Sequence, residues 1–239
     1  MQQASVPPVK PTSPSPATLP AGYVPTPSDS LQPETATATR TDVFTIEATP
    51  IWQSTNLSEN AQSGSTLKKG GTLTIQGAGT DMWKGYDRCR LVWTPTSGNY
   101  AFSTRVRTIA NNDDLAVTGL MVKGPDPAAG PGLLFGFLGN SYLFLQIRQP
   151  NKTVVVKSSG RPIHIPSYLQ FIRRGKTFEA YTSIDGHSWV HFASCELDMP
   201  NDATIGFVVS PQVPDTLATA TFTAIHLMTP LTFHEKNPK

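Results

Sequence analysis

The stretch YLQFIRRGKTFEAYTSIDGHSWVHF, residues 168–192, predicts three consecutive β-strands joined by tight turns. β-Branched and aromatic residues dominate the segments 167–174, 177–184 and 188–194, where several of them alternate with polar residues. Such alternation is typical of a strand that buries one face, and glycine or Asp-Gly between the segments indicates a turn. These features predict antiparallel strands and set the fold class for the rest of the chain.

Asp185 and Gly186 are predicted to form the second turn, Asp185 through a local hydrogen bond and Gly186 through a positive φ. A two-residue loop would mix polar and apolar residues on each face of the hairpin, whereas a three-residue loop over 184–186 separates them. The three-residue loop predicts the pairs Ser183–His187, Tyr181–Trp189 and Glu179–His191 on one face, with Phe178–Phe192 and Ala180–Val190 on the other. Any function of this hairpin is therefore expected on the Tyr181, Trp189 and His191 face.

The same strand signals recur along residues 42–230, where about a dozen short segments rich in β-branched and aromatic residues are separated by turn residues. No long segment has helical periodicity, and no repeat of fixed length is present. We predict an all-β sandwich of two antiparallel sheets. The longest apolar run, 132–147, is broken by Gly139-Asn140-Ser141, so it predicts a hairpin and no membrane span.

Residues 1–41 form a Pro/Thr/Ser-rich arm with almost no large apolar side chains, and residues 231–239 form a polar tail. The segment is predicted to be a disordered tail or linker or, because its composition favours extended polyproline II, an arm that loses little entropy when it binds along another surface. The arm therefore predicts contacts with a protein partner, and the candidate residues are Pro7, Pro8, Pro11, Pro14, Pro16, Pro20, Tyr23, Pro25 and Pro27.

Composition and charge exclude several classes of partner. Only 15% of the residues are charged and the formal net charge is +2, which predicts neither nucleic-acid nor membrane-surface binding. The Lys68-Lys69 and Arg173-Arg174 pairs are predicted to be solvated, and the pairing of Cys89 with Cys195 stays open. Without a visible secretory signal, the chain is expected to be cytoplasmic or membrane-peripheral if complete, and extracellular or periplasmic if a signal has been removed.

An ordered series of segments resembles a poorly characterised bacterial and fungal family of the concanavalin A-like lectin/glucanase superfamily. The segments are GTLTIQGAGTDMW (71–83), YDRCRLVW (86–93), NYAFSTRVRTI (99–109), LAVTGLMVKG (115–124), residues 168–192, ATIGFVVSPQ (203–212) and ATATFTAIHL (218–227). The family carries "GxGxDIW" and "SxDGxxW" motifs; here Met82 replaces the isoleucine, and Asp81, Trp83 and Asp87 match. The resemblance implies a jelly-roll sandwich with one concave sheet, a surface that relatives use for glycans.

Catalytic and metal-binding arrangements are poorly represented. The glucanase strand motif Glu-x-Asp-x-x-Glu has its nearest match at Glu196, Asp198 and Asn201, where an amide replaces the third carboxylate and cannot donate the proton. His187 and His191 would need Glu179 as a third zinc ligand, and solvated histidines near a turn are the simpler interpretation. We predict no catalytic residue, no metal and no cofactor.

Two functional hypotheses follow, with a third disfavoured. The first is a non-catalytic interaction or structural protein that docks on a larger assembly, with its arm along a partner. The second is a carbohydrate-binding module, because sugar rings stack on exposed aromatic side chains; its candidate residues are Trp83, Tyr86, Tyr181, Trp189 and His191. A glycoside hydrolase is disfavoured by the incomplete carboxylate motif.

Overall fold

The computed structural model describes residues 44–57, 63–80, 82, 87–110, 113–127, 130–149 and 152–230. The predicted arm and tail lie outside these residues. The described residues form strands and no α-helix, and so no helix among them is long and apolar enough to cross a membrane. The strands are β1 (Phe44–Ala48), β2 (Gln53–Asn56), β3 (Ser65–Lys69), β4 (Thr72–Gly77), β5 (Arg90–Ser97), β6 (Tyr100–Ala110), β7 (Val117–Lys123), β8 (Gly132–Leu138), β9 (Tyr142–Gln149), β10 (Lys152–Ser158), β11 (Ser167–Arg174), β12 (Thr177–Ser183), β13 (Val190–Glu196), β14 (Asp202–Ser210) and β15 (Ala218–Pro230).

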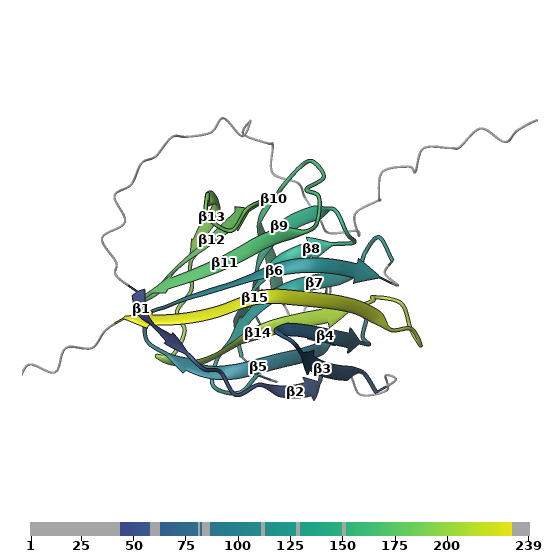
Figure 1. The fold of residues 1–239 in the computed structure, drawn as a ribbon, viewed down its shortest axis with the longest axis horizontal. Helices are drawn as coiled ribbons and strands as arrows, with labels where there is room; N and C mark the ends of the chain where they lie inside the picture. Colours follow the sequence, from purple (N-terminus) through teal and green to yellow (C-terminus); the bar gives the residue numbers. More distant parts are fainter. Residues whose placement is uncertain are drawn as a thin grey trace, which may run out of the picture.

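These strands pair into two antiparallel sheets that pack face to face, which confirms the predicted sandwich. Sheet A has the order β13-β12-β11-β6-β15-β4-β3, and β1 also pairs with β15. Sheet B has the order β10-β9-β8-β7-β14-β5-β2. Figure 1 views the sandwich face-on, with the long strands β6 and β15 crossing its middle. Some neighbours are consecutive strands, as in β7-β8-β9-β10 and β11-β12-β13, whereas the pairings of β6 with β11 and of β15 with β4 and β6 join distant parts of the chain.

The apolar strands are found where the sequence predicts them, and the polar ones are not. The predicted hairpin over 132–147 is confirmed as β8 and β9, joined by a turn at 139–141. Strands β2 (QSTN) and β3 (STLKK) were not predicted, because they are short, polar and largely exposed edge strands. They carry no apolar alternation that would distinguish them from loop.

Aromatic side chains from both sheets fill the space between them. Phe207 of β14 lies with its ring centroid 4.6 Å from that of Phe222 and 5.5 Å from that of Phe102, which belong to sheet A. Phe135 of β8 contacts Phe171 of β11 in the same way, at 5.5 Å. All five side chains have no solvent exposure. Each large ring buried in this way stabilises the sandwich by roughly 1.5–3 kcal/mol.

Sheet B is also buried on its outer face. Cross-strand neighbours on that face include Gly206, Met121, Leu134 and Gln146, which are all buried. The crossing segment, defined as the described residues 78–80, 82 and 87–89, places Met82 in the apolar cluster that includes Met121 and Leu134. Gly206 is required for the sheet itself, because a Cβ there would lie 1.9 Å from the carbonyl oxygen of Val92.

The crossing segment is attached to sheet B by a cluster of three charges. Asp87 accepts hydrogen bonds from Lys123 Nζ at 2.6 Å and from Arg148 Nε. The Lys123 and Arg148 side chains are each 2% exposed, and Asp87 is 15% exposed. Arg148 also donates to the carbonyl oxygen of Met82 at 2.8 Å, which ties the backbone of the segment to β9. Charges buried to this extent are stable only when paired and hydrogen-bonded.

Arg173 is a second buried cation, and here the sequence-based prediction was wrong. It was expected to be solvated, but its side chain is buried and donates to the carbonyl oxygens of residues 199–201 at 2.7–3.2 Å. Arg174, its neighbour, points to the opposite face and pairs with Glu179. The two arginines differ because successive side chains of a strand point to opposite faces.

Both cysteines are free thiols. Cys89 is completely buried beside the Asp87 cluster, whereas Cys195 lies half-buried on the edge strand β13. Burial raises the pKa of the Cys195 thiol to about 11. The fold is therefore held by packing and hydrogen bonds and not by a cross-link.

Substitution of Asp87 by alanine is expected to lower the free energy of unfolding by about 3–5 kcal/mol, because it leaves two buried cations without their carboxylate. Urea unfolding followed by tryptophan fluorescence measures this change. Asp198→Ala is the matched control, since this carboxylate pairs with Lys176 while 83% exposed and should change stability by less than about 1 kcal/mol. Equal effects of the two substitutions would contradict a structural role for the cluster.

Alkylation of Cys195 by iodoacetamide is expected to be about 100-fold slower at pH 8 than alkylation of an ordinary thiol. Only the thiolate reacts, and burial raises the pKa of the Cys195 thiol from 9.0 to about 11. The rate should rise with pH up to about pH 11. Mass spectrometry of the tryptic peptides separates Cys195 from Cys89, and urea-unfolded protein is the reference. Fast modification of folded protein at pH 8 would show that the thiol is not shielded.

Candidate functional site

The turn between β12 and β13 is built around the carboxylate of Asp185. Its Oδ1 accepts hydrogen bonds from the backbone N–H groups of His187 and Ser188, at 2.8 and 2.7 Å, and from the Ser183 hydroxyl at 2.9 Å. These hydrogen bonds, led by that from Ser188, hold the pKa of Asp185 well below its usual range. Gly186 has φ +79°, and its N–H donates to Ser183 Oγ at 2.9 Å. Both residues thus have structural roles in the turn.

The register of the hairpin differs from the prediction. The turn spans residues 184–189, not 184–186, and β13 contains a bulge, because Ala180 pairs with Ala193 while Tyr181 pairs with His191. Phe192 is the additional residue. The predicted pairs Tyr181–Trp189, Glu179–His191, Phe178–Phe192 and Ala180–Val190 are therefore wrong; the observed ones include Glu179–Ser194, Phe178–Cys195 and Thr182–Val190. The prediction failed because the longer turn already pairs Tyr181 with His191 instead of Trp189, and the bulge then shifts the register by one further residue.

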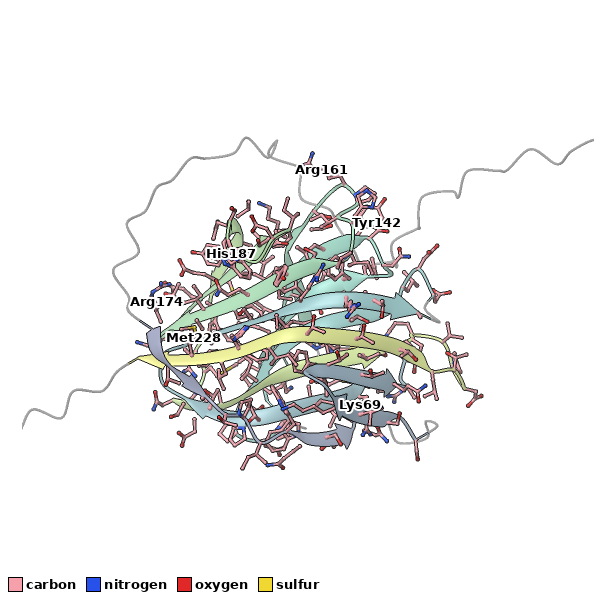
Figure 2. All side chains as sticks on the ribbon, viewed as in Figure 1. Lys69, Tyr142, Arg161, Arg174, His187 and Met228 are labelled. Atoms are coloured by element: carbon pink, nitrogen blue, oxygen red, sulfur yellow. The ribbon has the colours of Figure 1, made fainter. Side chains whose placement is uncertain are left out.

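Aromatic side chains gather beside this turn on the outer face of sheet A. Trp189 packs edge-on against Tyr168 of β11, with ring centroids 6.4 Å apart. Tyr181 packs edge-on against His191, with centroids 5.3 Å apart. His187 marks the turn in Figure 2, and Arg174, the last residue of β11, marks the other end of the β11–β12 pair. His191 also shares a hydrogen bond of 2.7 Å with Ser194 Oγ.

Polar side chains from the neighbouring strands complete this surface. Gln170 lies opposite Tyr181 on one side and Ser103 on the other. Arg105 of β6 lies opposite Tyr168, and its guanidinium carbon is 5.5 Å from the centre of that ring. We name this surface the aromatic face, and define it by Arg105, Tyr168, Gln170, Tyr181, Trp189 and His191. All six side chains are half-buried or exposed.

The structure brings together only part of the predicted site. Tyr181, Trp189 and His191 lie on the aromatic face, although Trp189 contacts Tyr168 and not Tyr181. Trp83 and Tyr86 lie outside the described residues, as do the proline and tyrosine candidates of the arm. Arg105 and Gln170 were not predicted; their only signal was an outward position on strands whose pairing with β12 the sequence does not reveal.

The carboxylates of the described chain do not form a hydrolase-like strand motif. Glu196 is the last residue of the edge strand β13, and Asp198 lies beyond it in an irregular segment, paired with Lys176 at 3.1 Å. Within the described residues, no group of three or more His, Cys, Asp or Glu side chains is placed to hold a metal ion. The aromatic face presents aromatic rings that can stack and side chains that can form hydrogen bonds.

No family model matches the chain, and no curated protein matches it. Among solved structures, a functionally unknown protein from Saccharomyces cerevisiae shares 15% identity, with a TM-score of 0.56 over 76% of this chain and 97% of that one. The carbohydrate-binding module CBM66 from Bacillus subtilis shares 15% identity, with a TM-score of 0.51 over 74% and 95%. A xylan β-1,4-xylosidase from Bacillus halodurans shares 10% identity, with a TM-score of 0.50 over 77% and 40%.

These similarities confirm the concanavalin A-like jelly-roll fold that the sequence predicts. At 10–15% identity they show the fold alone. The match covers 40% of the xylosidase chain, and the fold does not decide between binding and catalysis.

Substitution of Gly186 by alanine is expected to destabilise the protein and disrupt the aromatic face. An added Cβ would lie 2.9 Å from Tyr168 Cε1, in addition to the cost of about 1–2 kcal/mol for a non-glycine residue with positive φ. Gly175→Ala is the matched control, because Gly175 also has a positive φ (+59°) but no atom lies within 4 Å of its added Cβ. Urea unfolding should show a larger loss for Gly186→Ala; equal losses would mean that the ring contact is unimportant.

Proposed function

We propose that this protein is a non-catalytic carbohydrate-binding protein that binds a glycan chain on the aromatic face of sheet A. The observation that carries the proposal is the grouping of three partly exposed aromatic residues, Tyr168, Tyr181 and Trp189, on a solvent-facing sheet surface. Sugar rings present flat C–H surfaces that pack on such side chains, while neighbouring amides and hydroxyls bind the sugar hydroxyl groups. Gln170, which pairs with Tyr181, and Ser103, which pairs with Gln170, provide these polar groups.

The outer face of sheet B is a weaker candidate for this role. Its central residues Met121, Leu134 and Gln146 are at most 1% exposed, so a ligand would first have to displace the crossing segment. That displacement would leave the Asp87 cluster unpaired, at a cost that few ligands could offset. The aromatic face needs no such rearrangement.

The charges near the aromatic face favour binding over hydrolysis. Glu179 projects on the same side of the sheet as Tyr181, but it is engaged by Arg174. Glu196 lies at the far end of β13, opposite Thr177. A glycosidase needs two carboxylates roughly 5–10 Å apart across one bond, and these residues provide no such pair beside the stacked rings. Docking of the arm on a protein partner stays a prediction from the sequence.

Substitution of Tyr181 or Trp189 by alanine is expected to weaken polysaccharide binding about tenfold, because each ring contributes about 1.5 kcal/mol of stacking and burial. Affinity electrophoresis against a panel of soluble polysaccharides identifies a ligand, and titration calorimetry then compares the variants. Tyr142→Ala is the control, since this half-buried tyrosine lies on sheet B beside a different turn.

The proposal fails if no polysaccharide is bound, or if Tyr142→Ala weakens binding as much as the two substitutions on the aromatic face. Unfolding curves of each variant, measured beside the binding data, separate a lost contact from a lost fold.

A further inference from the structure

Arg105 differs from Arg90, Arg173 and Arg174 in the hydrogen bonding of its guanidinium group. Its Nε is buried and has no acceptor. By contrast, Arg90 donates to Asn56, Ser54 and Thr66, and Arg173 donates to backbone carbonyl groups. Arg174 pairs with Glu179. An unpaired guanidinium that is partly withdrawn from water loses solvation that nothing in the protein replaces.

The surroundings of Arg105 do not neutralise its charge. Its cross-strand neighbours are Tyr168 on β11 and Thr223 on β15, which are both uncharged. Arg107, two residues further along β6, is an exposed cation on the same face as the half-buried Arg105. The Tyr168 ring holds the guanidinium by a cation–π contact at 5.5 Å, which orients the group without satisfying its donors.

A planar guanidinium held beside a stacking surface is suited to a particular class of sugar. Arginine binds carboxylate and sulfate-like oxyanions through two parallel N–H···O hydrogen bonds, a geometry that lysine does not reproduce. A uronic acid or sulfated sugar stacked on Tyr168 and Trp189 would present such an anion at the edge of its ring. The hydroxyl groups of a neutral sugar can accept hydrogen bonds from Arg105, but they leave its positive charge without a counter-charge.

We propose that the ligand of the aromatic face is an acidic glycan, whose carboxylate or sulfate group is bound by Arg105. This inference rests on the proposed function and names the class of glycan that the site takes. Since the charge is partly exposed, the added affinity should weaken as ionic strength rises.

Paired ligands that differ only in charge test this inference with the full-length protein. Polygalacturonate is compared with its methyl-esterified form, and dextran sulfate with dextran, so that one pair tests carboxylate and the other tests sulfate. We expect at least one acidic polymer to bind about tenfold or more tightly than its neutral counterpart, because a charge-assisted bidentate contact forms only with the acidic polymer.

Substitution of Arg105 by glutamine should abolish that preference, and Arg105→Lys should restore only part of it. Arg161→Gln is the control, because this arginine, labelled in Figure 2, is exposed and lies in the loop between β10 and β11. The folded state should persist in Arg105→Gln, which removes an unpaired charge, and urea unfolding measures this directly.

The results distinguish this inference from the proposed function. Equal binding of acidic and neutral polymers that is lost in Tyr181→Ala would overturn the acidic class and support glycan binding. If the affinity for the acidic polymer decreases equally in Arg105→Gln and Arg161→Gln, the effect of charge is diffuse and the proposed role of Arg105 is overturned. Binding of neither member of either pair would count against the acidic class, and absence of binding across the wider panel against both proposals.

Discussion

The carboxylate of Asp87 imposes the strictest electrostatic constraint in the described structure, because it pairs with Lys123 and Arg148, two buried cations from different strands. Pairing holds the crossing segment on the outer face of sheet B, and that face becomes a second packed interior. Sheet B is therefore covered on both faces, an arrangement that accounts for the uninterrupted burial of β7 and β8. Strands buried on both sides lose their alternation and read as continuous apolar runs.

Because of this constraint, the two sheets differ in how much of their outer faces is exposed to solvent. Sheet B contributes its inner face to the sandwich and its outer face to the crossing segment, so little of its central surface meets solvent. Sheet A uses one face for the sandwich and leaves the other polar and partly exposed, with alternating burial along β4 and β12. Recognition of a large ligand is consequently easier on sheet A, where side chains can be contacted without opening the structure.

Sequence patterns predicted the fold class and the apolar strands, because burial of one or both faces leaves a visible hydrophobic signal. They did not predict β2 and β3, whose polar side chains are solvated. The turn residues Asp185 and Gly186 were identifiable from local chemistry, whereas the bulge at Phe192 was not, since it depends on how β13 packs. Arg105 was missed for a related reason: its importance arises from Tyr168, which lies 63 positions away and becomes a neighbour only through the pairing of β6 with β11.

The pairing of β1 with β15 has a mechanical consequence. Phe44 and Pro230 are opposite one another, so the two ends of the described chain leave from the same end of an antiparallel pair, as Figure 1 shows. Tension applied through these ends would act on the hydrogen bonds between β1 and β15 one after another. The two strands would therefore separate progressively from this end. Separation of β1 from β15 would end at Leu227, short of Thr223, the residue that pairs with Arg105. Under load, the tethered edge would yield at low force while the aromatic face was still formed.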